Sequence, residues 1–142
     1  MVKRFKDNGD GTVTDTEEGL MWKQTDGFQD QSMYHTWYKA EDYIRELNNS
    51  KFAGYNDWRM PNLEEAESLF VEETSIRDCD RFEIFIDNAF SPGGGHTVWT
   101  CDLRPHNGAV IFYYRYGHAN INNRDDPSKD SIRAVRTIAE EE

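Results

Sequence analysis

Short apolar segments separated by turn residues open the chain. Asn8-Gly9 and Asp10-Gly11 stand between the first β-prone segments, and Glu18-Gly19 precedes the apolar run Leu20-Met21-Trp22-Lys23. Asn and Gly both tolerate the positive φ angles that tight hairpin turns require. The pattern therefore predicts short strands joined by tight β-turns over residues 4–23.

Two helical patterns follow these turns. In the first, Thr36 is suited to cap a helix that begins at Trp37, and Asn48-Asn49-Ser50 is a stop signal. In the second, Asn62 and Glu65 have the spacing of a capping box. The expected apolar faces are Trp37, Ala40, Ile44 and Leu47 in the first helix and Leu63, Ala66, Leu69 and Phe70 in the second.

The second half of the chain changes in character. Its segments with an apolar or strand-like composition are residues 82–86, 97–100, 109–116 and 131–137. The order of elements predicts a single α+β domain over residues 1–142. Two helices should pack on one twisted antiparallel sheet, with long loops between the elements.

Side chains alternate within residues 109–116. One set consists of Val110, Phe112 and Tyr114, and the other of Ile111, Tyr113 and Arg115. Successive side chains of a strand point to opposite faces, so we expect one set to face the core and the other the opposite face. Phe112 should therefore lie on the opposite face from Tyr113 and Arg115.

Acidic residues outnumber basic ones. The chain has 27 Asp and Glu against 16 Lys and Arg, which gives a formal net charge of −11. Nucleic acid and anionic membrane surfaces both require a basic footprint on their partner, so we expect neither as a partner. No apolar run approaches the roughly 20 residues of a membrane span, and the segment from Met1 to Lys6 does not lead into the apolar stretch of a secretory signal.

Three groups of motifs occur in a recognisable order. The first is FKDNGDGTVTD at residues 5–15 with GLMW at 19–22, and the second is GYNDWRMPN at 54–62. The third comprises Trp99-Thr100, residues 112–117 and IRAVR at 132–136. Together they cover nearly the whole chain, and in this order the chain resembles the Lcl C-terminal-domain family.

The resemblance implies a C-type-lectin-like fold, the framework shared by the sulfatase-modifying-enzyme superfamily. Members of the family are chiefly binding modules, among them the trimeric C-terminal domain of a bacterial collagen-like adhesin that recognises sulfated glycans. Others resemble the variable proteins of diversity-generating retroelements, in which mutation of the C-terminal region changes the ligand. The chain departs from the family where Ala134 replaces a frequent cysteine, and its net charge of −11 disfavours polyanionic glycans.

The signature positions are expected to specify the fold rather than the function. Trp22, Trp58 and Trp99 should lie in the core, because large rings dominate the cores of small domains. Asp57 and Arg59 should tie down a loop. Arg133 and Arg136 should form charge pairs near the chain end, and Gly54 and Gly117 should mark backbone turns.

Residues 100–128 contain no Glu, Lys, Gln, Met or Trp, although these types make up 30 of the 142 residues. A stretch of this length should hold roughly six of them. Retroelement mutagenesis replaces template adenines, typically in Asn codons of the form AAY, and none of the five missing types can arise from such codons. Glu, Lys, Gln and Met also favour helices, so loops and strands are poor in them without any diversification.

Tyr, Asn, Arg and His crowd into the same segment, on predicted loops and one strand face, as they do in antibody binding sites. We therefore expect residues 100–128 to form a recognition surface on a scaffold of residues 5–99 and 131–137. The chain is predicted to be a non-catalytic recognition protein that binds a protein or glycan ligand and uses no cofactor. The candidate ligand-binding residues are Asp102, Arg104, His106, Asn107, Tyr113, Arg115, Tyr116, His118, Asn120, Asn122, Asn123 and Arg124.

Metal-binding patterns are incomplete. Asp7, Asn8, Asp10 and Asp15 resemble a calcium loop, but ligand positions of an EF-hand loop that starts at Asp7 would fall on Gly9 and Gly11. The four histidines have no metal-ligand spacing such as HExxH. They are His35, His96, His106 and His118.

Cys79 and Cys101 leave two alternatives open, one disulfide or two free thiols. Sulfatase-modifying relatives use a cysteine pair, but the residues around these two cysteines do not match that active site. A formylglycine-type modifying enzyme is therefore the rival from another functional class. Within the binding class, the alternative is a glycan-binding adhesin domain of fixed specificity.

Overall fold

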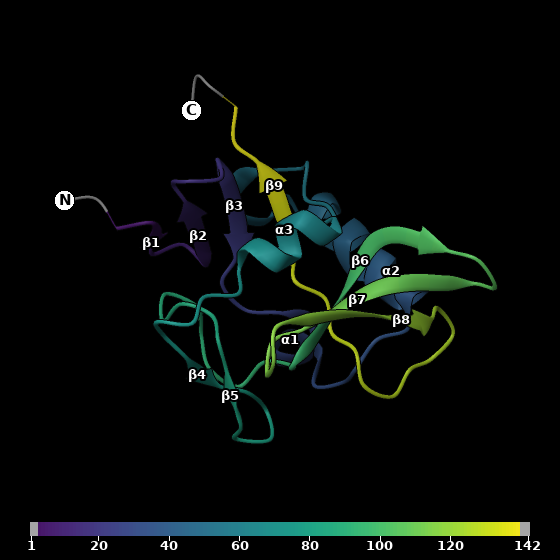
Figure 1. Cartoon of the computed structure of the whole chain (residues 1–142). Coiled ribbons are helices and arrows are strands. Elements are labelled where there is room, and N and C mark those ends of the chain that lie inside the picture. The colour runs from purple at the N-terminus through teal and green to yellow at the C-terminus, as the bar shows by residue number, and fades with distance from the viewer. Residues whose placement is uncertain (1–2, 140–142) are drawn as a thin grey trace.

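An N-terminal sheet joins the two ends of the described chain. The computed structural model describes residues 3–139, so residues 1–2 and 140–142 of the expected domain lie outside the described part. The strands of this sheet are β1 (Phe5–Asp7), β2 (Thr12–Asp15), β3 (Leu20–Lys23) and β9 (Val135–Thr137). They are antiparallel neighbours in the order β1-β2-β3-β9, so the C-terminal strand lies beside the third strand of the chain (Figure 1).

The turns of this sheet are the tight ones that the sequence predicted. Gly9 and Gly11 lie between β1 and β2, Gly19 precedes β3, and all three have positive φ. The acidic residues of the first turn accept local backbone hydrogen bonds: Asp7 from Gly9 and Asp10 from Thr12. These carboxylates therefore stabilise turns.

Three α-helices follow, and two were predicted. In α2 (Trp37–Asn49), Thr36 Oγ1 accepts the N–H of Lys39 at 3.0 Å. In α3 (Leu63–Ser68), Asn62 and Glu65 form the expected capping box. The five-residue α1 (Gly27–Gln31), which the sequence analysis missed, has a capping box of its own between Asp26 and Gln29. It is too short to show a helical period. A 3₁₀ turn at Phe52–Gly54 follows α2.

The remaining strands form two further sheets. β4 (Ile76–Arg77) pairs with β5 (Glu83–Ile84), and β6 (Thr97–Arg104), β7 (Gly108–Tyr113) and β8 (His118–Asn123) form a three-stranded antiparallel sheet in that order. The molecule is an α+β protein, as predicted, but the strands of residues 3–139 are divided among three sheets rather than one. Residues 118–123, which lie outside the predicted strand-like segments, form β8. Asn and His have low strand propensity, and pairing with β7 overrides that preference.

β7 is covered on both faces, which corrects the expectation of a single core face. Phe112 is 1% exposed and belongs to the apolar cluster that contains Leu69, which follows α3, whereas Ile111 is 4% exposed and belongs to the cluster that contains Trp37 and Ala40 of α2. Neighbouring residues of β7 therefore enter two different apolar clusters. Recognition residues of this sheet can lie only at the ends of β7 or on the neighbouring strands.

The three signature tryptophans are buried, as predicted. The indole N–H of Trp58 donates to the carbonyl of Phe52, and that of Trp99 donates to the carbonyl of His35. Positive φ angles of 90° at Gly54 and 77° at Gly117 confirm the two predicted backbone turns. At Gly117 a Cβ atom would clash with the Phe70 ring, so this turn also requires a residue without a side chain.

Charged signature residues attach the C-terminal segment to the rest of the fold. Arg136 pairs with Asp57 at 2.7 Å, and Arg59 pairs with Glu65 at 2.7 Å and donates to Thr137. Arg133 differs from the expectation, because its guanidinium donates to the carbonyl oxygens of Lys23 and Gln24 rather than to an acidic partner. Carbonyl groups at the end of a strand require donors when they are buried.

Candidate functional site

All twelve predicted ligand-binding residues lie on or beside the β6–β7–β8 sheet, and none is buried. The exposed ones are Arg104, His106, Tyr116, His118, Asn120 and Asn123. The half-buried ones are Asp102, Asn107, Tyr113, Arg115, Asn122 and Arg124. The sequence thus selected surface residues, although β7 itself is enclosed.

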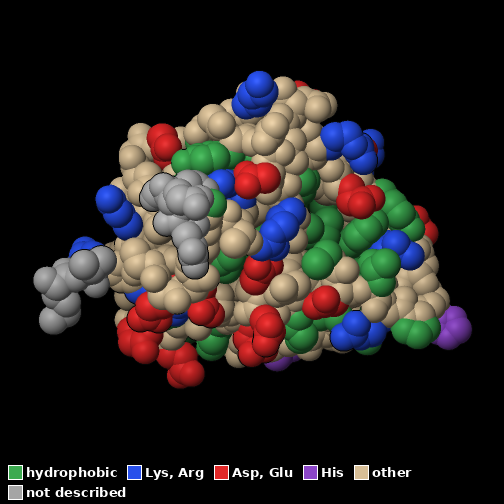
Figure 2. All heavy atoms as spheres, turned by 90° about the horizontal axis from the view of Figure 1, so that it is seen from above, with side chains coloured by type: hydrophobic (Ala, Val, Ile, Leu, Met, Phe, Trp, Pro, Cys, Tyr) green, Lys and Arg blue, Asp and Glu red, His purple; other side chains and the backbone are tan. Residues whose placement is uncertain are grey.

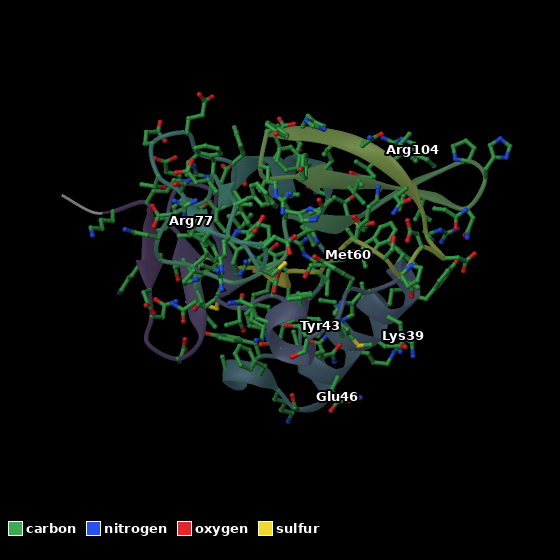
Figure 3. All side chains as sticks on the ribbon, turned by 90° about the horizontal axis from the view of Figure 1, so that it is seen from below. Lys39, Tyr43, Glu46, Met60, Arg77 and Arg104 are labelled. Atoms are coloured by element: carbon green, nitrogen blue, oxygen red, sulfur yellow. The ribbon has the colours of Figure 1, made fainter. Side chains whose placement is uncertain are left out.

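The structure divides these residues between the two ends of the β7–β8 hairpin. Tyr113 is opposite His118 at one end, and Gly108 is opposite Asn123 at the other. Five residue steps separate the ends, which is about 17 Å along a strand. Figure 3 labels Arg104, the last residue of β6, which lies at the second of these ends. Most of the predicted set therefore lies at these two ends, and Asn120 and Asn122 lie on β8 between them.

Aromatic rings make up the group at the β7–β8 turn. The ring of Tyr113 lies 5.5 Å from that of Tyr116 and 5.3 Å from that of His118, measured between centroids. Tyr116 is 75% exposed, the highest value among the large hydrophobic side chains of residues 3–139. We call Tyr113, Tyr116 and His118 the ring group.

Polar side chains make up the group at the β6–β7 turn. His106 and Asn107 both have positive φ there, a conformation that these residue types tolerate better than most. Asn107 accepts the hydroxyl of Tyr38 at 2.7 Å and donates to Asp125 at 2.8 Å. The guanidinium of Arg124 lies over the rings of Trp37 and Tyr38 of α2. This end of the hairpin is therefore connected to the start of α2.

Three more of the twelve residues form hydrogen bonds or ion pairs with other parts of the chain. Asp102 accepts the backbone N–H of Leu63 at the start of α3, and Arg115 pairs with Asp78 at 2.8 Å and with Asp80 at 3.1 Å. The side-chain amide of Asn122 donates to Asp130 at 2.6 Å. Substitution of these residues would disturb the fold as well as any ligand contact.

Several residues outside the predicted set complete the two groups. His96 packs its ring 5.4 Å from that of Tyr113, and Tyr34 lies 6.2 Å from His96. Tyr38 joins the other group through Asn107. No local pattern marks these residues, because only the tertiary fold brings residues 34–38 and His96 to the sheet. Their residue types, Tyr and His, were the one available signal.

Burial shifts the pKa of two side chains near the sheet. It lowers the pKa of His96, and the positive charge of Arg115 lowers it further, so the imidazole is neutral at pH 7. Burial raises the pKa of Asp130 to about 6, although the hydrogen bond from Asn122 acts in the opposite direction.

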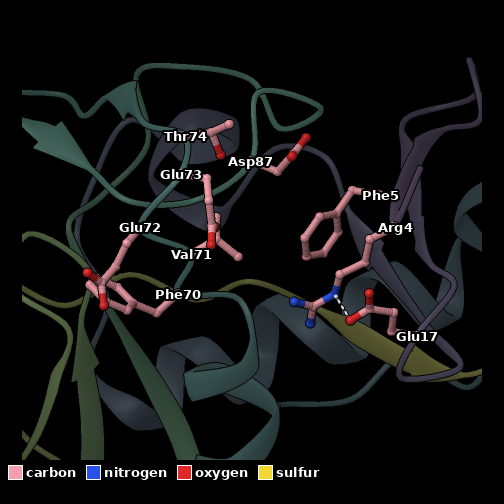
Figure 4. A pocket seen from close by; sticks show the side chains of 9 residues that line it. All are labelled: Arg4, Phe5, Glu17, Phe70, Val71, Glu72, Glu73, Thr74 and Asp87. Carbon is pink, nitrogen blue, oxygen red and sulfur yellow. Dashed lines mark ion pairs between the residues drawn. The ribbon is translucent and has the colours of Figure 1, made fainter.

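A wide acidic groove lies on the other side of α3. Its volume is about 700 Å³, and its lining includes four acidic residues, Glu17, Glu72, Glu73 and Asp87. Figure 4 shows Arg4 and Phe5 on one wall, with Arg4 paired to Glu17 at 3.4 Å, and Phe70 and Val71 on the other. The charge of this groove disfavours anionic ligands.

A smaller hollow of about 360 Å³ lies between α2 and residues 58–60, which precede α3. Trp37, Ile44, Trp58 and Met60 form its apolar walls, and Cys101 lies at its edge. Figure 2 shows the hydrophobic side chains gathered on this upper face of the molecule, toward the β6–β7 turn. Charged side chains of both signs, Glu41, Arg45 and Arg59, surround the hollow.

The two cysteines are free thiols in different surroundings. Cys79 contacts the hydroxyl of Tyr34 at 3.3 Å, and the N–H of Cys101 donates to the carbonyl of Pro61. Burial raises the pKa of both thiols, which disfavours the thiolate form that a nucleophile or metal ligand requires. Within residues 3–139, no three His, Cys, Asp or Glu side chains are grouped so that they could hold a metal ion. In that same range no helix is long and apolar enough to cross a membrane.

Comparison with known protein families gives a match over most of the chain. The model of the family described as the Lcl C-terminal domain matches residues 11–136, from the first β-turn to the C-terminal strand. No curated protein matches the chain. The matched range includes all three groups of signature motifs except the first residues of the N-terminal one.

Proposed function

This chain belongs to the Lcl C-terminal-domain family, and we propose from that premise that it is a non-catalytic recognition protein. Its ligand-binding surface would be formed by the two ends of the β7–β8 hairpin, with the exposed strand β8 between them. The scaffold beneath that surface would be a C-type-lectin-like fold, as the family resemblance implies.

One observation carries this proposal. The segment with the restricted residue types, 100–128, contributes every predicted contact residue, and none of them is buried. The core directly behind them, by contrast, is enclosed on both faces of β7. A surface built in this way can change its contact residues without loss of the core.

Diversification of that surface by a retroelement is the finer part of the proposal. Five of the six exposed candidates are Asn, His or Tyr, residue types that adenine mutagenesis of AAY codons can produce. The neighbouring DNA provides the direct test. A reverse-transcriptase gene with a near-repeat of codons 100–128 that differs only at adenines would establish diversification, and intact neighbouring DNA without them would exclude it.

Non-catalytic behaviour is supported by the surroundings of the two thiols. A formylglycine-type enzyme needs reactive cysteines, whereas here the pKa of each thiol is raised by burial. The glycan-binding alternative is supported by the exposed rings of the ring group, because such rings can stack on sugar faces. A protein ligand is supported by the same rings together with the polar side chains at the β6–β7 turn.

The test selects peptide ligands from a displayed random library on the immobilised chain and then measures their affinity for variants. We expect Tyr116→Ala or His118→Ala to weaken binding by about tenfold, because few residues dominate an interface. Their melting temperatures should stay near that of the parent, since changes at exposed positions usually cost within about 0.5 kcal/mol.

Two control variants complete this test. Lys39→Ala, at an exposed position of α2, should leave affinity unchanged. Phe112→Ala should lower stability by about 3–5 kcal/mol, as expected for a buried ring. If the selected peptides bind equally well to variants of Tyr116, His118, Asn120 and Asn123, the binding surface lies elsewhere and the proposal fails.

A further inference from the structure

The ring group is part of a longer row of aromatic rings. Phe28 of α1 lies 4.7 Å from Tyr34, Tyr34 lies 6.2 Å from His96, and His96 lies 5.4 Å from Tyr113. These partners are all half-buried, so each presents part of its ring to solvent. Phe28, Tyr34 and His96 lie outside residues 100–128, so the scaffold supplies half of the row.

Side-chain contacts outside the hairpin help to hold the scaffold half of the row. His96 Nδ1 bonds to Thr97 Oγ1 at 2.6 Å, and the hydroxyl of Tyr34 contacts Cys79 Sγ at 3.3 Å. Substitutions in the β7–β8 turn would therefore leave these two rings in place. A fixed half beside a changeable half suits a constant contact with one kind of ligand group.

A hollow opens in the middle of the row. It has a volume of about 280 Å³ and is lined by His96, Thr97, Ile111, Tyr113, His118, Asn120 and Lys129. Sites for small molecules usually occupy about 300–1,000 Å³. The hollow is therefore the size of a pocket for one side chain of a protein partner.

The lining of this hollow includes a cationic side chain, whereas the chain as a whole is acidic. None of the described residues that line it is acidic, and Lys129 lies at its edge. The acidic groove beside α3, by comparison, has four carboxylates in its lining. A ligand group that enters the hollow is thus attracted if it carries negative charge, while most of this chain of net charge −11 repels it.

We infer that the hollow between His96, Tyr113 and His118 binds an aromatic side chain of a protein partner, with an acidic residue beside it that faces Lys129. This inference rests on the proposed recognition function. Rings pack edge-to-face at the spacings seen in the row, and aromatic anchors dominate protein interfaces.

The experiment titrates the whole chain, labelled with nitrogen-15, with N-acetyl-Glu-Trp-Glu-amide. Amide shifts should change at Ile111, His118 and Asn120. The matched peptides N-acetyl-Lys-Trp-Lys-amide and N-acetyl-Glu-Ala-Glu-amide should each bind at least about fivefold more weakly, because each lacks one of the two recognised groups. Maltotriose serves as the glycan probe and should shift none of the three amides.

Two variants assign the contacts. Lys129→Gln and His96→Ala should each weaken binding of the Glu-Trp-Glu peptide by about fivefold, whereas Lys39→Gln on α2 should have no effect. Lys129 is an exposed residue, so its variant remains informative if His96→Ala proves unstable.

Three outcomes would overturn the inference. They are an absence of shifts with the Glu-Trp-Glu peptide, equal binding by Lys129→Gln and the parent, and shifts of the same amides by maltotriose. The recognition function itself would survive each of these if peptides selected from the library still depend on Tyr116 or His118, so the two failures are distinguishable.

Discussion

At the scale of single residues, Asp130 shows how burial changes a charge. Its carboxylate is fully buried, receives the amide of Asn122, and has a pKa raised to about 6. Because the folded protein holds this proton more tightly than the unfolded chain, the contribution of Asp130 to stability falls as the pH rises from about 4 to about 6. Above about pH 6 the carboxylate is ionised in the folded protein, and its burial lowers the free energy of unfolding by the full amount.

The variant Asp130→Asn removes the charge and keeps an oxygen that can accept from Asn122. It should therefore be more stable than the parent at pH 7.5, by an amount on the order of 2 kcal/mol. The gain should shrink as the pH falls through about 6 and approach zero below about pH 4, where Asp130 becomes protonated in both states. Thermal melting of both proteins over this range measures it, and a gain that is constant with pH would contradict the assignment.

At the scale of elements, β8 is an edge strand whose own side chains occupy some of its free backbone N–H groups. In the described part of the chain, β7 is its neighbour in the sheet and no strand lies on its other side. The N–H groups of Ile121 and Asn123 instead bond to the side-chain oxygens of Asn120 and Asn122, at 2.8 and 2.9 Å. Unpaired edges promote association between chains, so these asparagines act against it.

Asn120→Val should increase self-association, because it frees the N–H of Ile121 beside an isoleucine side chain that is 56% exposed. Sedimentation velocity over a concentration series would show a larger share of heavier species than for the parent. Asn120→Asp keeps the accepting oxygen and should behave as the parent does. Equal sedimentation of the valine variant and the parent would mean that the side chain does not protect the edge.

At the scale of the whole molecule, Val135 connects segments from three parts of the chain. It pairs with Trp22 in β3, exchanges two backbone hydrogen bonds with Arg59, and is buried. A chain that ends at Ala134 should therefore lose its cooperative thermal transition, since β3 and the segment at Arg59 lose their shared partner. Addition of a synthetic peptide of residues 131–139 should restore part of the near-ultraviolet circular dichroism. Cooperative melting of the shortened chain at the parental temperature would show that β9 is dispensable.

The sequence by itself determined the local features of this protein. The turns at Gly9 and Gly19, the cap at Thr36 and the capping box at Asn62 depend on neighbouring residues, so they could be predicted from short motifs. The family motifs pointed to the tryptophans that are buried in the core. Residue composition pointed to twelve candidate contact residues, and none of them is buried.

Only the tertiary structure decided which distant segments meet. It made the asparagine-rich segment 118–123 a strand, enclosed β7 on both faces, paired Arg115 with Asp78 and placed His96 beside Tyr113. Each of these results depends on residues well separated in sequence or on burial from two sides. Local propensity and periodicity carry no information about such contacts, because they describe how a segment behaves with its own neighbours.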